Sequence, residues 1–178
     1  MKQQFPEFFS SKKDDLSADI TKEIERYSKG YQRLNEAIGT ISGGKLNWKP
    51  NPKKWSIREI ALHLVDSEII GIARMNLVIA TSESNPPALL AYDQDQLSIL
   101  AAYHSMDEML ALQTFRDLRK HQTALLKNLP KEVFEKFGIH SEVGKLTLLD
   151  LVKRYASHVE THIKQIEGLK QLMKGEET

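Results

Sequence analysis

The chain has 178 residues, of which 40% are hydrophobic and 28% are charged. These proportions are typical of a globular protein and exclude collagen-like, disordered and purely coiled-coil chains. The length suits one domain with a sizeable core, so we assign residues 1–178 to a single domain. Lys and Arg number 25 against 24 for Asp and Glu, and the net charge of +1 provides no field that attracts nucleic acid or an anionic membrane.

Membrane insertion and disulfide chemistry are not expected either. No apolar run approaches the roughly 20 residues needed to cross a bilayer, and residues 1–16 are too polar for a signal peptide. The chain contains no cysteine, so thiolate ligands and a cysteine nucleophile are excluded, and the cytoplasm is the expected compartment. A soft-metal site would have to use imidazole, and six histidines are present.

The first half of the chain predicts two long helices. Apolar residues that recur every three or four positions predict the first over residues 16–41, and residues 1–15 are expected to be loosely ordered. A glycine pair ends this helix, and two prolines keep the chain out of helix until Ser56. Ser56 and Glu59 form an S-x-x-E capping box at the start of the second helix. That helix extends to Ile79 and is apolar over most of its circumference, so we expect it to be well buried.

A long connection separates the second helix from the third. A polar, proline-containing stretch at 82–87 closes the second helix, and residues 88–104 form the connection, with one short helix expected after Asp93. Ser105 and Glu108 match a second capping box, which predicts that the third helix begins there, and Pro130 stops it.

The last part of the chain predicts a loop and a fourth helix. Residues 131–145 contain turn-forming glycines and are expected to be a loop. Thr147 and Asp150 weakly resemble a third capping box before a helix whose apolar stripe runs from Leu148 to Leu169. We find no convincing two-residue alternation of a strand and no repeat. The prediction is an all-α four-helix bundle with a long connection between helices 2 and 3, with either neighbour order open.

Three histidines are candidate metal ligands. His162 falls within the inward arc of the last helix, and His158 lies about 40° further round. Their i, i+4 spacing brings the β-carbons to within roughly 5–6 Å, which allows both rings to bind one ion, although two structural histidines would show the same spacing. His63, at the edge of the apolar stripe of the second helix, is the best candidate for a third ligand. It is also consistent with a core histidine that donates one hydrogen bond.

Glu68 lies near the middle of the same apolar stripe. An unpaired carboxylate there would cost several kcal/mol, so it must find a proton, a cation or hydrogen-bond donors. It could bond a ligating imidazole, pair with an arginine, or act as a base, and the last option makes it a candidate catalytic residue.

The remaining histidines and the two tryptophans have weaker patterns. His121 lies off the stripe of the third helix and is interpreted as a solvated side chain, and His104 only precedes the start of that helix. His140 is placed in an exposed loop near the mouth of the bundle, with a substrate contact as the alternative. Trp48 and Trp55 are expected to pack in the core, with pocket lining as the alternative.

Three stretches resemble the DinB/YfiT-like family, which includes proteins regarded as metal-dependent hydrolases and thiol-dependent transferases. They comprise the entry to the second helix, a segment of the long connection and the approach to the last helix: LNWKP at 46–50 with KWSIRE at 54–59 and HLVDSE at 63–68, YDQD at 92–95, and GIHSEVGKLT at 138–147. The resemblance implies a four-helix bundle that holds one divalent ion, often nickel or zinc, through His63, His158 and His162. It also implies that dimers are common.

Three classes of function remain open at this stage. A three-imidazole site could activate a water for hydrolysis or a low-molecular-weight thiol for transfer to a small-molecule substrate, and the chain could not supply that thiol itself. A non-catalytic bundle that binds a metal or a small ligand is the second class. A helical interaction module with structural histidines is the third, and it predicts no stabilisation by metal.

Overall fold

The computed structural model of the protein describes residues 8–41, 43–82 and 84–176. Its longer helices are α1 (Phe8–Ser28), α2 (Gly30–Ile38), α3 (Ile57–Ala80), α5 (Glu108–Lys127) and α6 (Leu148–Glu176). The shorter elements are the helix α4 (Gln94–Leu100), the 3₁₀ helices η1 (Gly43–Asn47), η2 (Tyr103–Ser105) and η3 (Lys131–Glu135), and the strands β1 (Ala88–Leu89), β2 (Phe137–His140) and β3 (Gly144–Thr147). Within the described residues, no helix is both long and apolar enough to span a membrane.

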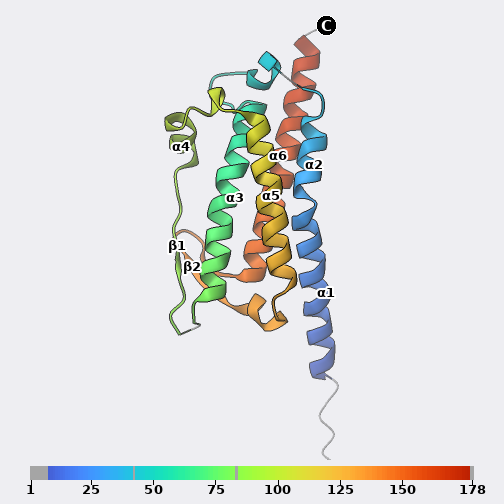
Figure 1. The fold of residues 1–178 in the computed structure, drawn as a ribbon, viewed down its shortest axis with the longest axis vertical. Coiled ribbons are helices and arrows are strands. Elements are labelled where there is room, and N and C mark those ends of the chain that lie inside the picture. The colour runs from blue at the N-terminus through green and yellow to red at the C-terminus, as the bar shows by residue number, and fades with distance from the viewer. Residues whose placement is uncertain (1–7, 42, 83, 177–178) are drawn as a thin grey trace, which may run out of the picture.

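The long helices form the predicted four-helix bundle, in which α1 and α2 together make one rod (Figure 1). This rod packs on α5 and α6, and α3 packs on the same two helices. The rod and α3, although consecutive in the chain, therefore lie at opposite corners of the bundle. Figure 1 also shows that α3 and α5 run in one direction while the rod and α6 run in the other. The neighbour order that the sequence left open is thereby fixed.

The rod is broken where we predicted one continuous helix over residues 16–41. The carbonyl oxygen of Tyr27 accepts a hydrogen bond from the buried guanidinium of Arg119 at 2.7 Å, and Lys29 is a turn residue between α1 and α2. A Cβ at Gly30 would lie 2.9 Å from Nη1 of Arg119, so the absence of a side chain there makes room for the guanidinium. The break is thus caused by a residue of α5 distant in sequence. The second segment ends at Ile38, earlier than predicted, where Gly39 takes a positive φ of 59°.

The first helix begins before residue 16, where we predicted its start. Residues 8–15, which we expected to be loosely ordered, form the first two turns of α1. Residues 1–7, covered by the same expectation, lie outside the described residues.

Helix starts agree with the sequence at α3, α4 and α6 and differ at α5. Ser56 and Glu59 form the reciprocal capping box at α3, and Asp93 caps the short helix α4 as expected. Thr147 and Asp150 exchange the hydrogen bonds of a capping box at α6. At α5 the cap is Asp107, whose carboxylate accepts from two backbone amides, and the predicted Ser105 box was wrong. Aspartate is as good a cap as serine, and the preceding residues are used by η2.

The predicted loop at 131–145 was wrong in part, because it contains η3, β2 and the start of β3. β2 and β3 pair antiparallel, and β1 from the long connection pairs parallel with β2. The short strands escaped detection because four residues give too little alternation. Their pairing ties the long connection to the bundle beside α3 (Figure 1).

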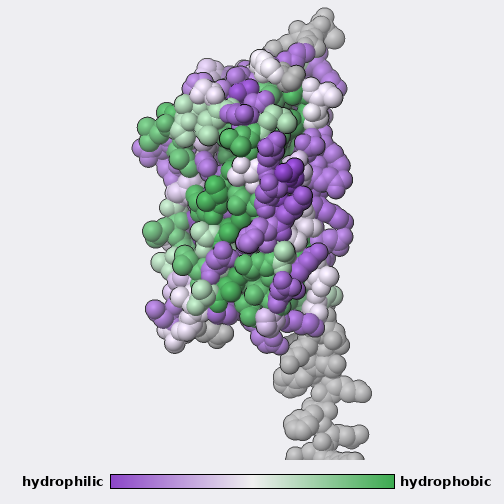
Figure 2. All heavy atoms as spheres, in the orientation of Figure 1, coloured by the Kyte–Doolittle hydropathy of each residue, from purple (hydrophilic) through white to green (hydrophobic). Residues whose placement is uncertain are grey.

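Hydrophobic side chains fill the bundle, and some also reach its surface. Two clusters of buried residues occupy the interior, one around Phe115 and Ile166 and one around Tyr27 and Val152. In the face of the molecule drawn in Figure 2, hydrophobic residues gather on the side of α3 and α4, whereas the side of α1 and α2 is mainly hydrophilic. The candidate metal ligands lie on α3 and α6, at the first cluster.

Candidate metal centre

Two rigid helices position the three candidate ligands. His63 lies in the second turn of α3, whose start is fixed by the Ser56 capping box. His158 and His162 lie one turn apart on α6. Burial raises the pKa of Glu59, but its ion pair with Lys49 at 2.6 Å and the backbone amide of Ser56 outweigh this effect and hold the pKa below its ordinary value. The charged carboxylate therefore stabilises the helix end that carries His63.

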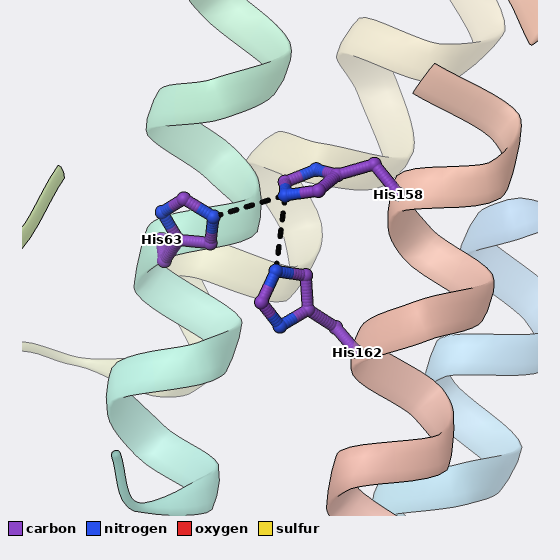
Figure 3. A group of neighbouring side chains, drawn as sticks. All are labelled: His63, His158 and His162. Carbon is purple, nitrogen blue, oxygen red and sulfur yellow. Dashed lines mark hydrogen bonds between the residues drawn. The ribbon is translucent and has the colours of Figure 1, made fainter. Parts of the chain in front are cut away.

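The three rings converge on one point between α3 and α6 (Figure 3). Nε2 of His158 lies 3.1 Å from Nε2 of His63 and 3.0 Å from Nε2 of His162. One nitrogen from each of the three rings falls within 4.8 Å of the others. Ligands of a tetrahedral zinc ion are roughly 3.3 Å apart, so the two separations from His158 come close to those of a bound ion.

Hydrogen bonds at the outer edges of two rings orient the inner nitrogens. Nδ1 of His162 donates to the side-chain oxygen of Gln165 at 2.8 Å, which leaves the lone pair of Nε2 facing the other rings. Nδ1 of His158 lies 3.3 Å from the hydroxyl of Ser67 on α3. Partners of this kind fix the tautomer and rotation of metal-bound histidines in other proteins.

The three imidazoles are neutral at physiological pH. Burial, with a smaller contribution from the other two rings, lowers the pKa of His63 to about 3. Burial followed by the ring of His162 lowers the pKa of His158 to about 3 as well. Burial also lowers the pKa of His162, although Gln165 opposes it. A neutral imidazole offers a nitrogen lone pair to a metal ion, and a cation placed among the three rings would be bound by one nitrogen of each. The donor set therefore fits a divalent ion that accepts nitrogen ligands.

An aromatic side chain covers one side of the centre. The ring of Trp55 is nearly parallel to that of His162, with centroids 6.3 Å apart and an interplanar angle of 7°. The Trp55 and His63 rings also form a T-shaped pair, with centroids 4.6 Å apart and an interplanar angle of 62°. Trp55 is half-buried and packs against the first cluster of the core while also lining a cavity, so both interpretations from the sequence apply to it.

Comparison with known proteins identifies the family. The model of the DinB superfamily matches residues 26–166, which include all three histidines. The chain belongs to the DinB superfamily. The protein called "Putative metal-dependent hydrolase YfiT" from Bacillus subtilis is 27% identical over 142 residues, which cover 79% of this chain and 78% of that protein. A second relative with the same type of name, OB0413 from Oceanobacillus iheyensis, is 25% identical over 146 residues, or 82% of this chain and 80% of the relative.

Two solved structures share the fold of this DinB chain. YfiT from Bacillus subtilis superposes with a TM-score of 0.79 at 24% identity and 87% coverage of both chains, and is described as a four-helix bundle of unusual topology. A mycothiol-dependent maleylpyruvate isomerase superposes with a TM-score of 0.67 at 5% identity, covering 83% of this chain and 60% of that one. At these identities the likeness concerns the fold alone.

Both carboxylate oxygens of Glu68 bind partners other than the three histidine rings. One oxygen forms an ion pair with Arg119 at 2.8 Å, and the other accepts a hydrogen bond from the hydroxyl of Tyr27. Burial raises the pKa of the Glu68 carboxyl, and the Arg119 guanidinium opposes that rise. Of the three possibilities raised by the sequence, the structure shows the pair with an arginine.

The other histidines lie away from the candidate ligands. His121 is exposed, as predicted, and His104 is exposed as well. His140 is buried at the end of β2, where its Nδ1 accepts a hydrogen bond from the backbone amide of Glu142, so its assignment to an exposed loop was wrong. The strand pairing of β2 with β1 explains the difference, because it covers the segment that was predicted to be free.

Sequence reasoning missed the outer partners of the candidate ligands. Gln165 follows His162 by three residues and Ser67 follows His63 by four, which are the spacings of neighbours on a helix surface. That spacing was a usable signal for Gln165, which bonds a ring on its own helix. Ser67 could not be found in this way, because it bonds His158 across the bundle.

Proposed function

We propose that this protein is a metal-dependent enzyme in which His63, His158 and His162 bind one nickel or zinc ion, and that it hydrolyses a small-molecule substrate. The observation that carries the proposal is the convergence of Nε2 atoms from the buried rings of His63 and His162 and from the half-buried ring of His158, the last two with hydrogen bonds at their outer nitrogens. The names of the DinB relatives support the same type of activity.

The residues of the chain would divide the work between holding and shielding the ion. An ion bound by three neutral imidazoles keeps its full charge and lowers the pKa of a coordinated water or thiol toward neutrality. Three protein ligands leave coordination positions free. Gln165 holds His162 in the ligating tautomer, Ser67 orients the ring of His158, and Trp55 shields one side from bulk water. Glu68 has no part as a base in this proposal, because both its oxygens are engaged.

Thiol transfer is the second reaction that such a centre supports. The chain has no cysteine, so a low-molecular-weight thiol would have to enter as a co-substrate. The fold is shared with an isomerase that is mycothiol-dependent by its description. The homodimer implied by the resemblance stays a prediction, which light scattering tests.

Metal analysis with a matched pair of variants tests the centre. We expect about one nickel or zinc ion per chain in the purified protein and in His121→Ala, whose histidine is exposed and remote from the rings. We expect none in His162→Ala, with the helical circular dichroism retained. Unchanged metal content in His162→Ala would contradict the proposal, as would the absence of any thermal stabilisation when metal is added to the metal-free protein.

A substrate panel then separates the functions. Metal-loaded protein is incubated with esters and amides, and in parallel with thiols and electrophiles, against free metal as the control. Turnover of the first set supports hydrolysis, and turnover of the second supports thiol transfer. The absence of turnover in either set, with metal bound, would favour the non-catalytic binding protein.

A further inference from the structure

A cavity of about 390 Å³ adjoins the candidate metal centre. His162 and Trp55 both line it, so a molecule in the cavity contacts a ligand ring and the aromatic side chain that covers it. The volume lies within the range of roughly 300–1,000 Å³ that is usual for small-molecule sites. Gln94 also lines the cavity, which brings the YDQD segment of the long connection to the same place.

The walls of the cavity combine apolar and cationic character. Ile60, Leu169 and Leu172 contribute hydrophobic surface, and Lys53 and Lys54 contribute two ammonium groups. Among the described residues that line the cavity there is no aspartate or glutamate. A neutral apolar ligand would leave the two ammonium groups without a counter-charge, and they would repel a cationic ligand.

The two lysines differ from other lysines nearby in having no counter-ion. Lys49 pairs with Glu59 at 2.6 Å and Lys170 pairs with Glu167 at 3.1 Å. Within the described part of the chain, the ammonium groups of Lys53 and Lys54 form no ion pair and no hydrogen bond. Two adjacent positive charges without partners raise the local concentration of anions and favour a ligand that carries a negative group.

We propose that this cavity binds the substrate of the metal centre and that the substrate is a small organic carboxylate with an apolar body. The carboxylate lies between Lys53 and Lys54, and the apolar body packs on Leu169 and Leu172 toward His162. This inference rests on the proposed function for the role of the bound molecule, but the binding itself depends on residues that are not metal ligands.

Paired probes test the binding by isothermal titration calorimetry. The probes are 4-phenylbutyrate and 4-phenylbutanamide, which share an apolar body and differ in the charge of one end. We expect the carboxylate to bind about fivefold to tenfold more tightly than the amide at low salt, because each exposed lysine contributes a modest attraction. The preference should shrink in 0.5 M salt, where the Debye length falls to roughly 4 Å.

Two double variants of equal charge identify the residues responsible. Lys53→Gln/Lys54→Gln should abolish the preference for the carboxylate, and Lys120→Gln/Lys131→Gln, remote from this cavity, should retain it. A preference that is absent in the natural protein, or that survives in Lys53→Gln/Lys54→Gln, would overturn the proposal.

Metal removal separates this proposal from the proposed function. All titrations are repeated on chelator-treated protein, and the metal content of each variant is measured. A preference due to the lysines persists without metal, whereas a preference seen only in metal-loaded protein means that the ion binds the carboxylate and overturns the assignment to Lys53 and Lys54. Metal content reports on the three histidines independently of either result.

Discussion

The buried ion pair between Glu68 and Arg119 gives the strongest prediction for stability. Both side chains are almost fully buried, at 1% and 2% exposure, and they join α3 to α5. Replacing Glu68 with Gln preserves the shape but leaves the guanidinium without its counter-charge. Removal of one partner from a buried pair costs about 3–5 kcal/mol. For a domain of this size, that loss lowers the melting temperature by about 6–20 °C.

The loss cannot be recovered by the remaining contacts of Arg119. Its guanidinium also donates to the carbonyl oxygens of Tyr27 and Tyr155 and lies 3.8 Å from the centroid of the Tyr27 ring. These groups are neutral, so they solvate the cation but do not neutralise it. The double variant Glu68→Leu/Arg119→Met removes both charges, and we expect it to be closer in stability to the natural protein than Glu68→Gln.

Urea denaturation followed by circular dichroism measures the effect. The matched control is Asp19→Asn, which breaks a half-exposed ion pair with Lys153 and should cost less than about 1 kcal/mol. Metal content should be unchanged in Glu68→Gln, because the carboxylate faces Tyr27 and Arg119. A loss below about 1 kcal/mol in Glu68→Gln, equal to that of the control, would refute the reasoning.

Three further changes probe the packing, the ligand support and the helix start. Gly71→Ala places a Cβ 2.5 Å from the ring of Tyr155 and should cost about 1–3 kcal/mol in thermal unfolding. Gln165→Ala removes the partner of His162 and should weaken metal affinity by about 10-fold to 100-fold in a competition titration. Glu59→Gln should cost about 0.5–1 kcal/mol at pH 7, measured with urea. Because the folded pKa of Glu59 lies below its ordinary 4.5, its stabilisation is present above about pH 4.5. It is lost as the pH falls through the folded value, so the difference between variant and natural protein should shrink in acid.

Controls of the same residue type accompany the first two of these changes. Gly168→Ala adds a Cβ that meets nothing within 4 Å, so it should be neutral or stabilising in the helix. Gln113 is exposed on α5, away from the rings, and Gln113→Ala should leave metal affinity unchanged. Equal effects in a variant and its control would contradict the corresponding prediction. For Glu59→Gln, the prediction would be contradicted if the difference in free energy of unfolding from the natural protein stayed constant from pH 7 to pH 3.5.

The parts of the fold that could be predicted are those encoded locally. Periodicity indicated the four long helical segments, and the box of Ser56 and Glu59 indicated the start of α3 where the structure has it. The break between α1 and α2 could not be found in this way, because it depends on Arg119, which is 92 residues away from Tyr27. The strands escaped for a similar reason, since β2 is held by pairing with β1 across the long connection.

The candidate site likewise has a part that local sequence patterns indicate and a part that depends on contacts distant in the sequence. Angular placement put His162 in the inward arc and His63 and His158 near its edge, and the family resemblance indicated all three as ligands. The structure brings their nitrogens together. The angle of a residue on its helix says nothing about which helices are neighbours, so the packing of α3 against α6 had to come from the structure. The cavity beside His162 combines residues from the turn before α3, from α4 and from α6, and no local pattern could have assembled it.

X-ray absorption spectroscopy of the metal-loaded protein tests the central claim most directly. The scattering pattern of imidazole rings counts the histidines bound to the ion and gives their distances. We predict three imidazole nitrogens at about 2.0–2.1 Å in the natural protein and a lower count in His63→Ala. An ion bound by one imidazole or none, with oxygen atoms in the other positions, would contradict the account.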